Sequence, residues 1–80
     1  MEIRNWYILN GAFWCDIRDT GYFTFHMCKI VKYNSKTNEI KIINGNHTEM
    51  TFILDFKKMD SYFITTNKIG KFKEYLANYE

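Results

Sequence analysis

The stretch Trp6-Tyr7-Ile8-Leu9-Asn10-Gly11-Ala12-Phe13-Trp14-Cys15 decides the fold, because two apolar, aromatic-rich runs are separated by Asn-Gly. Asn-Gly is the favoured pair of a two-residue type I′ turn between antiparallel strands. Such a turn places Ile8 opposite Phe13 and Trp6 opposite Cys15, so apolar side chains share one face of the hairpin. We therefore expect a β-hairpin here.

Further turn signals follow at Asp19-Thr20-Gly21, at 34–38 and at Asn44-Gly45-Asn46, with the spacing of a β-meander. They predict strands at about 3–9, 12–18, 22–33, 39–43, 47–56 and 61–66. Side-chain alternation then gives one apolar core face: Trp6, Ile8, Phe13, Cys15, Ile17, Phe23, Phe25, Met27, Val31, Tyr33, Ile40, Ile42, Met50, Phe52, Leu54 and Phe56. Lys29 breaks the alternation, which a β-bulge or a barrel rim would explain.

The end of the sequence changes from strand to helical spacing. Ile69, Phe72, Leu76 and Tyr79 recur at intervals of a helix, which predicts a helix at about 68–79. The fold that follows is a single domain over 1–80 and mainly β. It is an antiparallel meander of five or six strands, open and strongly twisted or closed as a small SH3-like barrel, with one C-terminal α-helix.

Composition and charge narrow the class of protein. The 80 residues carry a net charge of +2 and only two arginines, Arg4 and Arg18, which is too little to argue for nucleic acid by charge alone. No apolar run approaches the roughly 18 residues of a membrane span, and the first residues do not resemble a signal peptide. Cys15 and Cys28 are then expected as reduced thiols of a cytoplasmic protein. Abundant Ile, Lys, Asn, Phe and Tyr suggest AT-rich codons, as in some bacteria, their phages and some eukaryotic parasites.

No catalytic or metal-binding motif is present in the sequence. His26 and Cys28 fall on one strand face, but about 7 Å apart, beyond a hydrogen bond. Cys15, His26, Cys28 and His47 lack the paired short spacings typical of zinc sites. We therefore expect neither an enzyme nor a bound cofactor or metal.

The second face of the predicted sheet is the most informative feature. It carries Trp14, Tyr22, His26, Cys28, Ile30, Ile43, His47 and Ile53. The expected register sets Trp14 beside His26 and Ile30 beside Ile43. Either the C-terminal helix covers this face, or a partner binds there, since tryptophan and tyrosine are enriched among residues that dominate interfaces. The candidate partner-binding residues are Trp14, Tyr22, His26, Ile30, Ile43 and His47.

Two functions follow as expectations. The first is a non-enzymatic protein-binding module, for example a phage protein that inhibits a host protein, or one that binds a second copy of itself. The alternative is a small β-barrel that binds single-stranded RNA or DNA. For that alternative the contacts are lysines interleaved with aromatic residues: Lys57, Lys58, Lys68, Lys71 and Lys73.

Overall fold

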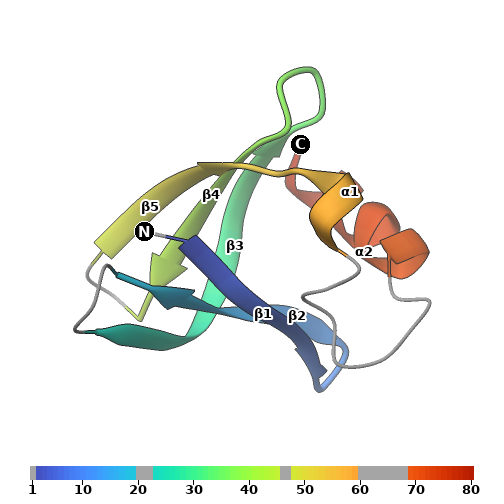
Figure 1. Ribbon diagram of the computed structural model, residues 1–80. Helices are drawn as coiled ribbons and strands as arrows, with labels where there is room; N and C mark the ends of the chain where they lie inside the picture. The colour runs from blue at the N-terminus through green and yellow to red at the C-terminus, as the bar shows by residue number, and fades with distance from the viewer. Residues whose placement is uncertain (1, 20–22, 46–47, 60–68) are drawn as a thin grey trace.

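The computed structural model describes residues 2–19, 23–45, 48–59 and 69–80. Its elements are β1 (Glu2–Leu9), β2 (Ala12–Arg18), β3 (Thr24–Asn34), β4 (Glu39–Asn44), β5 (Thr48–Ile53), the helical turn α1 (Phe56–Met59), α2 (Ile69–Leu76) and the 3-10 turn η2 (Ala77–Tyr79). The strands form one antiparallel meander in the order β1-β2-β3-β4-β5, and the sheet does not close into a barrel (Figure 1). The mainly β class, the meander and the C-terminal helix are thus confirmed.

The first hairpin forms as the Asn-Gly pair predicts. Ile8 lies opposite Phe13 and Trp6 opposite Cys15. Asn10 and Gly11 have φ values of 52° and 78°, and a type I′ turn requires a positive φ at both central residues. Turn chemistry therefore sets the register of β1 on β2 from the turn as far as Asn5.

The loop between β3 and β4 also sets its register as predicted, with Tyr33 opposite Ile40. Asn38, the last loop residue, adopts a left-handed φ of 60°, which asparagine tolerates better than most residues. The Tyr33 hydroxyl donates a hydrogen bond of 2.7 Å to Asn38 Oδ1 and so ties the loop to the core.

Strand β3 departs from simple alternation at two β-bulges. Its register shifts once opposite the segment Cys15–Ile17 of β2 and again between Ile30 and Lys32. Each extra residue reverses which face the following side chains take. The predicted faces of four residues are therefore wrong: Cys28 and Ile30 are buried in the core, whereas Met27 and Val31 are exposed. Lys29 lies between the bulges and is exposed, which explains its break in the pattern.

The start of β3 also differs from the predicted pattern. A three-residue Asp19-Thr20-Gly21 loop would set Ile17 opposite Phe23. In the structure the Asp19 amide donates to the Phe23 carbonyl at 2.9 Å, and Ile17 lies opposite Phe25. Phe23 was expected in the core, and this prediction is wrong, since 66% of its surface is exposed.

Strand β5 ends at Ile53, so the prediction of strand to residue 56 is wrong. Asp55 is the physical reason, because its side chain accepts the Lys57 amide at 3.0 Å and its carbonyl accepts the Lys58 amide at 3.0 Å. A carboxylate that accepts an amide two residues on is a helix N-cap, and the turn α1 follows. The predicted strand at 61–66 and the predicted helix start at 68 lie outside the described residues.

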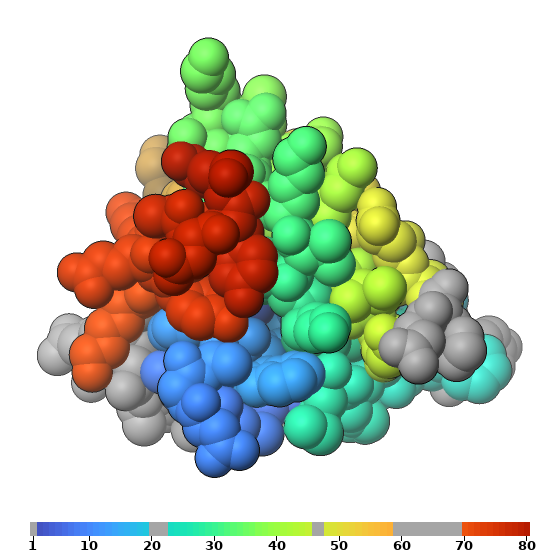
Figure 2. Space-filling view, turned by 180° about the vertical axis from the view of Figure 1, so that it is seen from behind, coloured from blue at the N-terminus to red at the C-terminus, as the bar shows by residue number. Residues whose placement is uncertain are grey.

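Helix α2 covers the face of the sheet that carries the buried side chains, which we name the inner face. Phe72 and Leu76 are fully buried, and the Phe72 ring lies 4.6 Å from the Trp6 ring and 5.2 Å from the Phe13 ring, measured between centroids. Figure 2 shows α2 and η2 lying directly against the β1–β2 hairpin and beside β3. The helix therefore does not cover the opposite face of the sheet, which we name the outer face.

Candidate functional site

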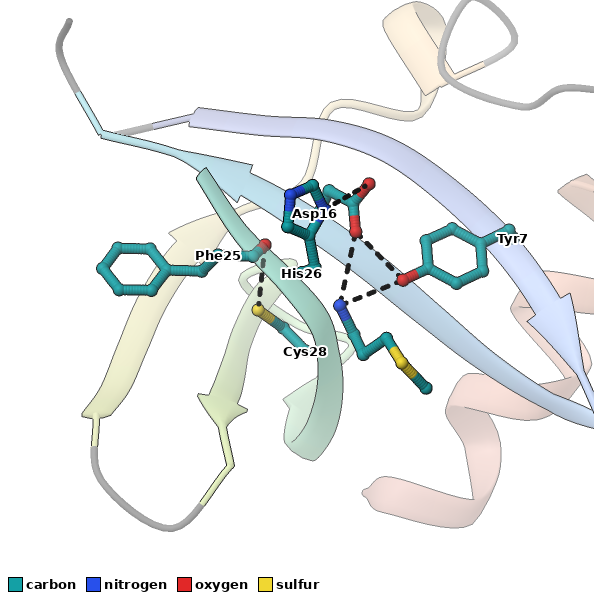
Figure 3. A network of polar contacts seen from close by, with 6 residues as sticks. Tyr7, Asp16, Phe25, His26 and Cys28 are labelled. Carbon is teal, nitrogen blue, oxygen red and sulfur yellow. Dashed lines mark hydrogen bonds and ion pairs between the residues drawn. The ribbon is translucent and has the colours of Figure 1, made fainter. Parts of the chain in front are cut away.

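A polar network on the outer face joins β1, β2 and β3 around the Asp16 carboxylate (Figure 3). The Tyr7 hydroxyl donates to Asp16 Oδ1 at 2.9 Å. The Met27 amide donates to the Tyr7 hydroxyl at 3.0 Å and to Asp16 Oδ1 at 3.3 Å. The His26 ring approaches from the other side, with Nδ1 at 3.4 Å from Asp16 Oδ2. One carboxylate thus organises three neighbouring groups.

This network exists because of the first β3 bulge. The pairs Cys15–Cys28 and Ile17–Phe25 leave two residues, His26 and Met27, opposite Asp16 alone. Met27 takes the left-handed conformation, with φ of 54°. Its amide points away from the regular ladder, and the side chains of Tyr7 and Asp16 accept it instead. Side chains from two other strands therefore hold the bulge in place.

A cavity of about 340 Å³ lies beside the network. Its lining contains both arginines of the chain, together with Asp16, His26 and residues of β1 and β3: Arg4, Asn5, Asp16, Arg18, Phe23, Thr24 and His26. Arg4 falls at an irregularity of β1, where the register with β2 shifts between Ile3 and Asn5. Three strands thus supply two guanidinium groups and an imidazole to one hollow, and Phe23, directly before β3, adds an exposed phenyl ring.

Burial and hydrogen bonding shift the ionisation of Tyr7. Desolvation, followed by the hydrogen bond to Asp16, raises the pKa of the Tyr7 phenol from 10.0 to about 12. The phenol therefore remains a hydrogen-bond donor to Asp16 at neutral pH. Arg4 forms only a long contact with Glu2, 3.9 Å between Nη1 and Oε1, and both side chains are largely exposed.

The two cysteines lie on the inner face, away from this site. Cys15 and Cys28 are directly opposite each other on β2 and β3, and both are fully buried. The hydrogen bond between the thiols raises the pKa of Cys15 far above its ordinary value and lowers the pKa of Cys28. The expectation that Cys28 shares a face with His26 is wrong, because the bulge between them reverses the alternation. A Cys28–His26 pair is therefore not formed.

The predicted partner-binding residues do not all gather on one surface. His26 lines the cavity, and Trp14 and Ile43 are half-buried on the outer face. Lys29 separates those two, since it lies opposite Trp14 on one side and Ile43 on the other, so the predicted pairs Trp14–His26 and Ile30–Ile43 are wrong. Ile30 belongs to the core, where it lies opposite Ile42. Tyr22 and His47 lie outside the described residues.

Four of the five lysines predicted to contact nucleic acid lie on the two helices that the structure describes. Lys57 and Lys58 on α1 and Lys71 and Lys73 on α2 are exposed, whereas Lys68 lies outside the described residues. Lys73 Nζ lies 4.8 Å from the centre of the Phe56 ring, which joins the two helices. A second, more open hollow of about 380 Å³ lies between α2 and the β1–β2 hairpin and includes Lys71. Phe72, an aromatic residue interleaved with these lysines in the sequence, is buried in the core and is not accessible for base stacking.

Sequence reasoning missed Tyr7, Arg4, Arg18, Phe23 and Met27 as parts of the site. One signal was available for the arginines, because the chain has only two and both fall near strand ends. The signal for Met27 was indirect: Lys29 at a core position required a bulge somewhere near it.

Comparison of the chain with family models, with curated proteins and with solved structures finds no match. Within the described ranges, no helix has the length and apolar character needed to cross a membrane. In the same part of the chain, no group of three or more His, Cys, Asp or Glu side chains is placed to hold a metal ion.

Proposed function

We propose that this chain is a non-enzymatic module that binds another protein through the surface around the first β3 bulge. We name this the bulge surface and define it by Arg4, Arg18, Phe23, His26 and Met27. The observation that carries the proposal is Met27, an apolar side chain that is 51% exposed although its backbone is held in a strained conformation.

The strain at Met27 argues for a selected feature. A left-handed residue other than glycine costs about 1–2 kcal/mol, and glycine would avoid that cost. Here methionine is kept, and the hydroxyl of Tyr7 and the carboxylate of Asp16 hold its amide. A strained residue fixed by its surroundings commonly marks a functional position. Presentation of the methionine side chain is the function that we assign to the bulge.

The composition of the bulge surface is that of a protein interface. Interface cores are enriched in arginine, methionine and aromatic residues and depleted in lysine. Both arginines of the chain contribute to this surface, whereas none of the nine lysines lines its cavity. Phe23, at 66% exposed, supplies a large apolar side chain at the rim.

Local charge favours protein over nucleic acid at this surface. Two carboxylates lie near Arg4 and Arg18 without a close ion pair to either: Asp16 lines the same cavity, and Glu2 is 3.9 Å from Arg4 and lies opposite Arg18. The positive charge at this surface is therefore local and does not extend along a groove. A nucleic-acid backbone requires an uncompensated positive field along several phosphates. The wider role that we propose, a phage or mobile-element protein acting on a host protein, rests on chain length and composition.

Site-specific crosslinking tests the proposal. A photoreactive benzoylphenylalanine replaces Phe23 in one variant and Ile53 in a control, because both native side chains are 66% exposed. In extract of an AT-rich bacterial host, we expect the label at 23, but not at 53, to give one dominant adduct, with crosslinked peptides that map to a single surface of its partner. Unlabelled wild-type protein should compete, and Met27→Gly should not. Identical adducts from both positions, or none from position 23, would refute the proposal.

Nucleic-acid binding remains a second candidate because the exposed lysines of α1 and α2 are neighbours. It predicts that fluorescent single-stranded RNA or DNA binds with an affinity that falls steeply between about 50 and about 200 mM salt. Lys57→Gln combined with Lys58→Gln should then weaken binding. No salt-dependent change in anisotropy would eliminate this candidate.

A further inference from the structure

The cavity of the bulge surface has hydrogen-bond donors that the protein itself leaves unused. Guanidinium groups carry five donors in a planar fork that matches a carboxylate or phosphate. Among the described residues, Arg18 forms no ion pair, and Arg4 reaches Glu2 only at 3.9 Å. A charge-assisted hydrogen bond of good geometry measures about 2.7–2.9 Å. Both arginines are thus available to an incoming oxyanion.

Asp16 does not compete for these donors, because its oxygens are already engaged. Oδ1 accepts from the Tyr7 hydroxyl and the Met27 amide, and Oδ2 faces His26 Nδ1. The contact at Nδ1 fixes the ring so that the second imidazole nitrogen, Nε2, is left for a ligand. The two arginines line one cavity with His26, and their guanidinium groups can serve as donors to a single group.

The size and rim of the cavity restrict the ligand further. A volume of about 340 Å³ is near the lower end of small-ligand sites, which span about 300–1,000 Å³. It accommodates one charged side chain and a neighbour, not a run of nucleotides. The exposed Phe23 ring at the rim offers an apolar contact beside the charge.

We propose that this cavity is an oxyanion subsite that takes one carboxylate of the protein partner, from an aspartate or glutamate with an aromatic or apolar residue beside it. This inference rests on the proposed function, since it names the chemistry that the bulge surface recognises. A carboxylate is favoured over the phosphates of a nucleic acid because Glu2 and Asp16 would repel a polyanion, whereas a single charge requires only the two arginines that line the cavity.

Titration of the isolated protein tests the subsite without a known partner. The probes are acetyl-Phe-Asp-amide, its neutral counterpart acetyl-Phe-Asn-amide, inorganic phosphate and a short oligothymidylate. Nuclear magnetic resonance follows the side-chain N–H signals of Arg4 and Arg18. We expect the acidic peptide to shift both signals saturably, with a dissociation constant in the millimolar range, and the neutral peptide to bind about tenfold or more weakly.

Substitutions at the arginines test whether the peptide binds in this cavity. Arg18→Gln should weaken the acidic peptide about tenfold, and Arg18→Lys should not restore it fully, because lysine lacks the bidentate fork. Lys36→Gln, at an exposed residue of the loop between β3 and β4, should leave binding unchanged. Well-dispersed backbone spectra should show that each variant is folded. Arg4→Gln provides a second test at the same cavity.

Three results would overturn the subsite: no saturable shift, equal binding of both peptides, or tighter binding of phosphate or oligothymidylate than of the acidic peptide. These results are distinguishable from failure of the proposed function. Specific crosslinks from position 23 without peptide binding would retain the protein-binding surface and remove only the carboxylate subsite. Peptide binding without such crosslinks would remove the proposed partner interaction.

Discussion

At the scale of single residues, Met27 separates stability from binding. Replacing it by glycine relieves the left-handed strain. Glycine also loses more conformational entropy on folding, which lowers stability by about 0.5–1 kcal/mol and offsets that gain. Met27→Gly should therefore leave the free energy of unfolding within about 1 kcal/mol of wild type, while crosslinking from position 23 is lost. Urea unfolding followed by circular dichroism measures the first quantity. A loss of several kcal/mol would show that the exposed side chain serves the fold.

The raised pKa of Tyr7 makes the stability of the folded protein depend on pH in the alkaline range. An unfolded tyrosine loses its proton near pH 10, whereas Tyr7 in the folded protein has a pKa of about 12. Between these values the folded protein binds more protons than the unfolded chain, so this contribution to stability is complete below pH 10 and is lost as pH rises to about 12.

Tyr7→Phe should consequently give a shallower loss of stability above pH 10 than wild type. At neutral pH it should cost about 1 kcal/mol, because the Met27 amide and Asp16 lose a partner. Urea midpoints at about pH 7, 10 and 11 measure both effects. Tyr79→Phe is the comparison variant, because the hydrogen bond with Tyr75 and burial also raise the pKa of Tyr79 to about 12. It should reduce the loss of stability above pH 10 in the same way, but without affecting the Met27 amide. An unchanged pH slope in Tyr7→Phe would contradict the assignment.

At the scale of elements, local turn chemistry made two hairpins predictable. Asn10-Gly11 fixes β1 on β2, and the loop that ends at Asn38 fixes Tyr33 opposite Ile40. Both signals lie within the turns themselves, and a positive φ at Asn10, Gly11 and Asn38 is what those residue types favour. Register next to these two turns therefore needs no information from elsewhere in the chain, although it shifts farther along each pair, between Ile3 and Asn5 and between Ile30 and Lys32.

Strand β3 was not predictable in the same way, because its first bulge depends on distant residues. The Met27 amide is accepted by Tyr7, 20 residues away, and by Asp16, 11 residues away. No local sequence pattern predicts acceptors so far away in the chain. Only Lys29 indicated that the alternation of buried and exposed side chains is interrupted in this strand. The candidate site follows the bulge, so the sequence predicted His26 but neither its neighbours nor the cavity they form.

At the scale of the whole molecule, the small core makes the fold depend on α2. A domain of 80 residues has a stability on the order of 4–12 kcal/mol. Phe72 is fully buried between Trp6 and Phe13, and loss of such a ring costs about 3–5 kcal/mol.

Phe72→Ala should accordingly remove a large part of the total stability and lower the urea midpoint to match, whereas the exposed Phe23→Ala should change it by no more than about 0.5 kcal/mol. Because each variant removes one phenyl ring, the difference between their free energies of unfolding reports how deeply each ring is buried. Since α2 packs on the inner face, Phe72→Ala should destabilise the bulge surface only through global unfolding, so the fraction still folded should bind acetyl-Phe-Asp-amide as wild type does. Weaker binding by the folded fraction would mean that the two faces of the sheet are coupled.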